Sequence, residues 1–157
     1  MVQQILALGK TRPHDFCQSI RSTESLRRRI GEQAQHRCGY CQTQERVSGI
    51  PLTLEHIIPR SLGGLDTEEN LWVSCRLCNE AKGIQVEAID PLTGEKAHLF
   101  NPRIDQWHQH FRWGKDGTEI IGPTEVGRAT VNALALNTEF RVRSRAIWVE
   151  AGYHPPA

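Results

Sequence analysis

The sequence of 157 residues lacks several features that mark special classes of protein. No apolar run approaches the roughly 18 residues that a membrane-spanning helix requires. Charge of one sign is also missing, since 19 Lys and Arg face 18 Asp and Glu, and this balance excludes a histone-like polycation. The first residues show neither a charged segment ahead of an apolar one nor a small-residue cleavage site. We therefore expect a non-secreted, cytoplasmic protein without a membrane segment.

The composition is that of an ordinary folded domain. Hydrophobic residues make up 38% and charged residues 24% of the chain, which is typical of neither disordered nor fibrous proteins. Repeats and low-complexity segments are absent from the sequence. Lysine is scarce, since 15 of the 19 basic residues are arginine. The planar group of arginine suits phosphate, but an excess of arginine can also reflect genomic composition. The length leaves room for a single domain over residues 1–157.

The cysteines carry the strongest signal. Four of the five form two Cys-x-x-Cys pairs: Cys38, Cys41, Cys75 and Cys78. Two such pairs supply the four sulfurs of a tetrahedral structural zinc site. Disulfides are disfavoured by the odd cysteine number and the missing export signal, and redox motifs rarely occur in twos. The leftover Cys17 is expected to be a small buried hydrophobic residue. Zinc would act as a scaffold, because residues 42–74 are poor in apolar side chains.

Around the cysteine pairs, the pattern predicts a strand, a loop, a second strand and a short helix. The first strand is expected over residues 52–58, between two prolines, and the second over residues 71–74. The turn-rich stretch between them predicts a loop. After Cys78, a short helix is expected to end at Gly83.

The flanks predict helices and one hairpin. Leu26, Ile30 and Ala34 repeat at helical spacing and indicate a helix within residues 22–37. Residues 107–113 alternate as a strand, with the aromatic residues expected in the core, and a turn leads to a second strand at 118–121. Two helices follow. Thr124 caps the first, and the second spans about 138–151, with an apolar face expected to point inward and formed by Phe140, Ile147 and Ala151.

Two short stretches hold residues suited to chemistry. Glu55 and His56 end the first predicted strand and precede a loop with paired glycines, which places a base beside an anionic ligand. Asn79 directly follows Cys78, so a zinc scaffold would fix its position. A carboxylate and an amide oxygen without a sulfur or imidazole ligand form a hard oxygen site. Such a site favours Mg²⁺ or Mn²⁺.

From Cys38 to about Lys82 the sequence resembles the HNH endonuclease family, in its zinc-stapled branch with two Cys-x-x-Cys pairs and the ββα-metal fold. The resemblance implies that His56 is the general base and that Glu55 and Asn79 hold a catalytic Mg²⁺ or Mn²⁺. It also implies that Asn70 braces the loop that orients the base. Glu55 stands where Asp is commoner in the family, and Asn79 stands where the family has His or Asn.

The resemblance also sets the expected architecture. We expect an α+β fold, with a ββα-metal module over residues 38–84 that a zinc ion with four cysteine ligands staples together. An N-terminal helix over residues 22–37 precedes this module, and a β-hairpin with helices over residues 85–157 follows it.

The expected function is metal-dependent hydrolysis of DNA. The segment 55–82 carries a net charge of about −2, which suits a cation rather than DNA. Most of the phosphate affinity is therefore expected from three flanking groups: the helix with Arg27, the face with His108, His110 and Arg112, and the last helix with Arg141, Arg143 and Arg145. The residues considered for phosphate contact are Arg27, Arg28, Arg60 and Lys82. A solvated surface explains each of these equally well. Two alternatives stay open, a non-catalytic zinc-knuckle module that binds nucleic acid and a purely structural zinc module that docks a protein partner.

Overall fold

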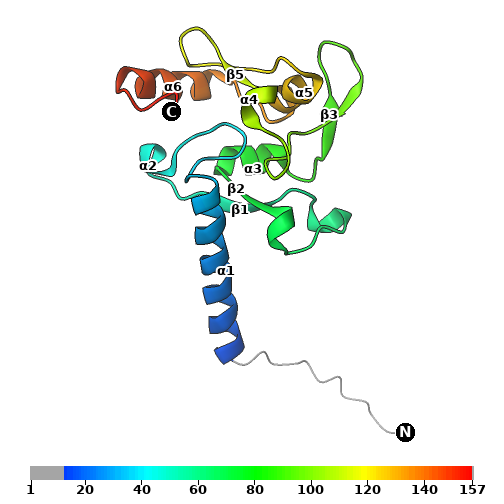
Figure 1. Cartoon of the computed structure of the whole chain (residues 1–157), viewed down its shortest axis with the longest axis vertical. Helices are drawn as coiled ribbons and strands as arrows, with labels where there is room; N and C mark the ends of the chain where they lie inside the picture. Colours follow the sequence, from blue (N-terminus) through cyan, green and yellow to red (C-terminus); the bar gives the residue numbers. More distant parts are fainter. Residues whose placement is uncertain (1–12, 157) are drawn as a thin grey trace, which may run out of the picture.

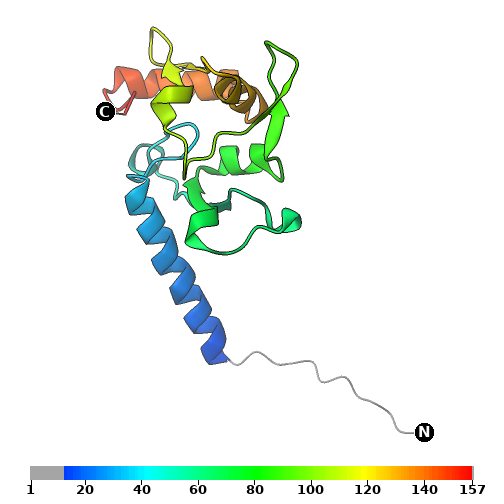
Figure 2. The same ribbon diagram turned by 45° about the vertical axis from the view of Figure 1, so that its right-hand side comes forward.

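The computed structural model describes residues 13–156, and it describes side chains from residue 23 onward. The expectation for Cys17 therefore lies outside the described side chains. The first helix, α1, spans Pro13–Gln33 and extends away from the body of the protein (Figures 1 and 2). It begins well before the predicted residue 22, with proline at its first position, where the missing N–H costs nothing. None of the described helices is long and apolar enough to cross a membrane.

The central module has the predicted strand, loop, strand and helix. Strand β1 (Thr53–His56) pairs antiparallel with β2 (Leu71–Ser74), so that Glu55 lies opposite Trp72. Helix α3 (Arg76–Lys82) follows β2 directly and ends at Gly83, as predicted. It begins three residues earlier than predicted, immediately after Cys75. The α+β fold class is confirmed.

Three short elements complete the module. A one-turn helix, α2 (Glu45–Ser48), follows the first cysteine pair. The loop between the strands is irregular except for two 3₁₀ turns, η1 (Arg60–Leu62) and η2 (Glu68–Asn70). This loop leaves from the end of β1 that carries His56.

The C-terminal part lies on the side of the module opposite to α1 (Figures 1 and 2). It contains two β-hairpins and three helices: β3 (Glu87–Ile89), β4 (Lys96–His98), α4 (Trp107–His110), β5 (Arg112–Trp113), β6 (Ile120–Ile121), α5 (Glu125–Ala133) and α6 (Glu139–Glu150). The β3–β4 hairpin was not predicted. The predicted strand over residues 107–113 is wrong for its first half, because residues 107–110 form helix α4.

The structure confirms the predicted cap of α5 and contradicts the predicted inward face of α6. Thr124 caps α5 as predicted and accepts a hydrogen bond from the amide of Gly127 at 3.0 Å. The prediction that Phe140 and Ile147 of α6 point inward is wrong, since they are 71% and 64% exposed. Arg145 is buried instead and donates to the carbonyl of Leu136 at 2.6 Å. Helix α6 therefore buries an arginine that bonds a loop carbonyl, and the apolar spacing does not indicate its buried face.

One apolar core joins the module to the C-terminal part. Phe100 packs edge-on against Tyr40 of the module and against Phe111, with ring centroids 6.5 and 5.1 Å apart. The indole N–H of Trp107 donates to the carbonyl of Tyr40 at 2.8 Å. The aromatic residues near the second hairpin thus belong to the core, as predicted.

Candidate metal centre and active site

The four paired cysteines meet in one cluster, which we call the cysteine cluster. Their sulfurs lie within 4.8 Å of one another, and none is in a disulfide: Cys38, Cys41, Cys75 and Cys78. The Sγ atoms of Cys41 and Cys75 are 3.7 Å apart. A tetrahedral zinc ion with Zn–S bonds of about 2.3 Å places its sulfurs about 3.8 Å apart. The cluster therefore fits the predicted structural zinc.

Local backbone geometry brings the sulfurs together. Gln42 adopts a positive φ of 58°, and its amide donates to the carbonyl of Cys38, which closes the first turn. Cys75 caps α3, and the amide of Asn79 donates to the Cys75 carbonyl at 3.0 Å. Each pair thus forms a tight turn. The amide of Gly39 in the first turn donates to the carbonyl of Val73 in β2 at 3.1 Å, which places the first turn beside the second.

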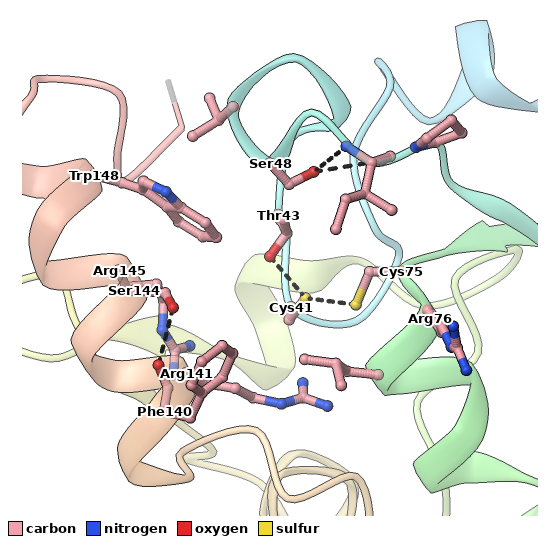
Figure 3. A pocket seen from close by; sticks show the side chains of 14 residues that line it. Cys41, Thr43, Ser48, Cys75, Arg76, Phe140, Arg141, Ser144, Arg145 and Trp148 are labelled. Carbon is pink, nitrogen blue, oxygen red and sulfur yellow. Dashed lines mark hydrogen bonds between the residues drawn. The ribbon is translucent and has the colours of Figure 1, made fainter.

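A positively charged side chain from α6 reaches the cysteine cluster. The guanidinium of Arg141 donates to the sulfur of Cys78 at 3.2 Å. Four thiolates around one Zn²⁺ leave two negative charges, which a nearby guanidinium partly offsets. Figure 3 shows the adjoining pocket of about 260 Å³, in which Cys41 and Cys75 face Phe140 and Trp148 of α6. Arg141, Arg143 and Arg145 were expected in solvent or on phosphate, so this contact was missed.

The predicted chemical residues line a second pocket of about 380 Å³. We call it the Glu55 pocket. Glu55 and His56 enter it from the end of β1, and Asn79 enters it from α3. Arg60 lines the same pocket from turn η1. The structure therefore brings together the predicted base and both predicted ion ligands.

Glu55 is buried, with only 3% of its surface exposed. Its Oε1 accepts a hydrogen bond from the hydroxyl of Tyr40 and lies 3.4 Å from the ammonium nitrogen of Lys82. Its Oε2 is buried and has no hydrogen-bond partner among the described residues. Burial raises the pKa of the Glu55 carboxyl, whereas the charge of Lys82 and the hydroxyls of Tyr40 and Ser74 lower it. A buried carboxylate oxygen without a partner fits a bound cation.

His56 is held by a carboxylate from the loop. Its Nε2 lies 2.6 Å from Oδ1 of Asp66, and the guanidinium of Arg60 grips both oxygens of Asp66 at 2.7 and 3.0 Å. The hydrogen bonds from Arg60 and His56 lower the pKa of Asp66 to about 2. Asp66 therefore stays ionised near neutral pH and accepts the hydrogen of His56 Nε2.

Asn70 lies outside the Glu55 pocket and bonds the loop behind it. Its Oδ1 accepts from the amide of Ile58, and its Nδ2 donates to the carbonyls of Ile58 and Leu65, each at 2.9 Å. Gly64 is required at this point, because an added Cβ would lie 1.7 Å from the carbonyl oxygen of Ile58. These contacts fix the loop that carries Asp66.

The side-chain amide of Asn79 has one clear contact. Its Nδ2 donates to the hydroxyl of Thr53 at 3.2 Å. Because the Nδ2 group points to Thr53 of β1, the amide oxygen Oδ1 is the atom that could bind a cation. Together with the unpartnered oxygen of Glu55, it gives the hard oxygen donors that Mg²⁺ or Mn²⁺ prefers.

The residues considered for phosphate contact occupy very different positions. Arg28 is 74% exposed and only 4.0 Å from Glu32, and Arg60 is 69% exposed beside Asp66. Arg27 is one-third exposed and already bonded to Glu24 and Glu45.

Lys82 is buried, so it does not lie on a surface that DNA could touch. Only 2% of the residue is exposed, and its ammonium donates to the carbonyl of His56 at 2.9 Å. The expectation of a phosphate contact does not fit this buried position. The sequence did not indicate the burial, because the charge partner of Lys82, Glu55, is 27 residues away along the chain.

Three residues of the site were missed by sequence reasoning. They contact the chemical residues or the cysteine cluster and come from separate segments: Tyr40, Asp66 and Arg141. Tyr40 had one available signal, since it stands inside the first cysteine turn and its position is therefore fixed. Asp66 and Arg141 had none, because only the folded loop and α6 bring them to their partners.

Comparison with known proteins bears directly on this module. Residues 38–85 match the family described as HNH endonuclease. We call this matched segment the HNH module. The match and the cysteine cluster together confirm the resemblance to the zinc-stapled branch. No curated protein and no solved structure matches the chain. An HNH module implies nuclease-type activity or nucleic-acid binding.

Proposed function

We propose that the protein is a metal-dependent endonuclease that hydrolyses DNA phosphodiester bonds, with His56 as the general base. Glu55 and Asn79 would hold the divalent ion, Mg²⁺ or Mn²⁺. The observation that carries this proposal is the Glu55 pocket, in which an imidazole, an unpartnered carboxylate oxygen and an amide meet. When bound, the ion would offset the charge that develops on the phosphate and on the departing oxygen.

The tautomer of His56 follows from its contact with Asp66. An ionised carboxylate only accepts hydrogen bonds, so the hydrogen of the neutral imidazole resides on Nε2. Nδ1 is then the basic nitrogen that takes a proton from the attacking water. Asp66 keeps the ring in one orientation, and Asn70 keeps the loop that carries Asp66 in place.

Substrate affinity must come from exposed basic groups around the pocket. Arg60 lies at the pocket itself, and Arg28 lies on α1, which extends from the body of the protein. Removing a side chain that binds one phosphate should lower the salt slope of binding by about one unit. Arg60 is the stronger candidate, because turn η1 fixes it beside the reacting groups.

A non-catalytic nucleic-acid-binding module is the second candidate. One observation favours it, the nearly complete burial of Glu55 against Lys82 and Tyr40. A binding module would retain salt-dependent affinity without requiring a divalent ion.

The two candidates differ in a plasmid-cleavage experiment with Mg²⁺, Mn²⁺ or EDTA. We expect the parent protein to nick or linearise supercoiled DNA only with the ion, and we expect His56→Ala to lose at least 100-fold in rate. His98→Ala is the matched control, because His98 is exposed, lies outside the pocket and is not on a face considered for phosphate contact. Equal cutting by His56→Ala would contradict the assigned base. No cutting by zinc-loaded parent, with retained DNA binding, would favour the binding module.

A further inference from the structure

The carboxylate of Glu55 is held from both turns of the cysteine cluster. Tyr40 stands between Cys38 and Cys41, in the first turn, and its hydroxyl donates to Glu55 Oε1. Tyr40 is fully buried, so its ring cannot turn toward water. A phenol hydroxyl that faces a carboxylate oxygen acts as the hydrogen-bond donor.

The second support comes from the turn formed by Cys75 and Cys78. That turn begins α3, and Lys82 lies one helical turn after Cys78 on the same helix. Its ammonium is 3.4 Å from Glu55 Oε1 and donates to the backbone carbonyl of His56 at 2.9 Å. One buried cation therefore contacts the predicted ion ligand and the backbone of the predicted base.

We propose that Tyr40 and Lys82 are positioning residues that connect the cysteine cluster to the divalent-ion site. Both contact the same oxygen of Glu55, and the other oxygen, Oε2, has no hydrogen-bond partner among the described residues. The proposal rests on the proposed function, because it assigns these residues a role at that same site. Residues that orient a metal ligand from behind usually contribute 10- to 100-fold to metal affinity or activity.

This arrangement gives the cysteine cluster a second role. A zinc staple alone needs only the four sulfurs, whereas here each turn also carries one partner of Glu55. Because Tyr40 and Lys82 follow their cysteines at fixed short distances, the position of the carboxylate depends on the geometry of the cluster.

The sharpest test is Tyr40→Phe, which removes one hydroxyl and keeps the ring that packs against Phe100. We would measure Mn²⁺ binding to zinc-loaded full-length protein by electron paramagnetic resonance, without DNA, together with zinc content. We expect unchanged zinc content and roughly 10-fold weaker Mn²⁺ binding. Tyr153→Phe is the matched control, since Tyr153 is 58% exposed. Parent-like Mn²⁺ affinity in Tyr40→Phe would overturn the proposal.

A second variant separates positioning from phosphate contact. Lys82→Met should reduce kcat by about 10- to 100-fold and leave DNA affinity, measured on zinc-loaded protein without added Mg²⁺ or Mn²⁺, and its salt slope unchanged. A salt slope lower by about one unit would show a phosphate contact and overturn the assignment. Lys96→Met is the control, because the Lys96 side chain is 68% exposed beside Glu87. If Lys82→Met fails to fold, the result with Tyr40→Phe decides.

Measurements on the parent protein separate a failure of the proposed nuclease function from a failure of the positioning role alone. A parent that neither binds Mn²⁺ nor cleaves DNA would overturn the proposed function and this proposal together. A parent that does both, with Tyr40→Phe and Lys82→Met unchanged in every measurement, would overturn the positioning role alone.

Discussion

The HNH module and the C-terminal part are stabilised by different means. The module relies on four sulfurs in addition to its share of the common apolar core. The C-terminal part relies on apolar packing, with Phe111 and Leu134 almost completely buried, and none of the four sulfurs lies in it. Metal ligands act through a few strong contacts, whereas an apolar core acts through many weak ones. We therefore expect the removal of one zinc ligand to unfold the module. The removal of one apolar side chain should only lower the free energy of unfolding of the C-terminal part.

Removal of one cysteine ligand should have the largest effect. Cys78→Ser removes a fully buried sulfur of the cysteine cluster. Because structural zinc contributes about 10–16 kcal/mol of apparent binding free energy, we expect loss of zinc and unfolding of the HNH module. Zinc content and circular dichroism with and without a chelator would measure this. Cys17→Ser is the control, since the spacing leaves Cys17 outside both pairs. Retention of a full zinc ion by Cys78→Ser would contradict the assigned ligands.

A core substitution in the C-terminal part should have a smaller effect. Phe111→Ala removes a ring that is 1% exposed and packs between Phe100 and Trp107. We expect the free energy of unfolding to fall by about 3–5 kcal/mol, with zinc retained. Denaturant unfolding would measure it. Phe140→Ala is the matched control, because Phe140 is 71% exposed and its removal should change the free energy of unfolding little. A large cost for Phe140→Ala would show that α6 buries this face after all.

The smallest expected effect is the loss of folding stability at low pH through His154. Burial lowers the pKa of His154, which packs against Trp113, from its ordinary value of 6.5 to about 4. The folded protein therefore holds His154 neutral, while the unfolded chain takes up a proton below pH 6.5. Stability from this group is complete above pH 6.5 and is lost as the pH falls toward 4, by at most about 1.4 kcal/mol per pH unit.

The measurement compares unfolding of the parent and His154→Gln between pH 7 and pH 4. Zinc ligands are common to both proteins, so the difference isolates His154. We expect the stability of the parent to fall more steeply than that of the variant. A substitution at the exposed His108, to Gln, should leave the slope unchanged. Parallel curves for parent and His154→Gln would mean that the His154 ring is solvated.

Much of the module could be predicted because its signals are local. The cysteine spacing identified all four members of the cluster, and the strands bounded by turns were found at nearly the right residues. Glu55, His56 and Asn79 line one pocket, and the cysteine pairs lie close in sequence to the elements that carry them. Their roles as base and ion ligands stay predictions.

Other features could not be predicted, because they depend on partners far apart in sequence. Helix α6 carries apolar residues at helical spacing, yet it buries Arg145, which donates to the Leu136 carbonyl. Residues 107–110 alternate like a strand, but the helix they form places the Trp107 indole on the Tyr40 carbonyl. Tertiary contacts override a weak local pattern when they satisfy a buried polar group.

The sequence by itself determined the cysteine cluster, the ββα order of the HNH module, the Thr124 cap and the identity of the residues that meet in the Glu55 pocket. Each of these follows from residues close in sequence, whose spacing limits where they can point. Only the tertiary structure decided that Lys82 is buried against Glu55, that Asp66 holds His56 and that Arg141 reaches Cys78. The physical reason is that the burial of a charge depends on its partner, and the partner is supplied by another part of the fold.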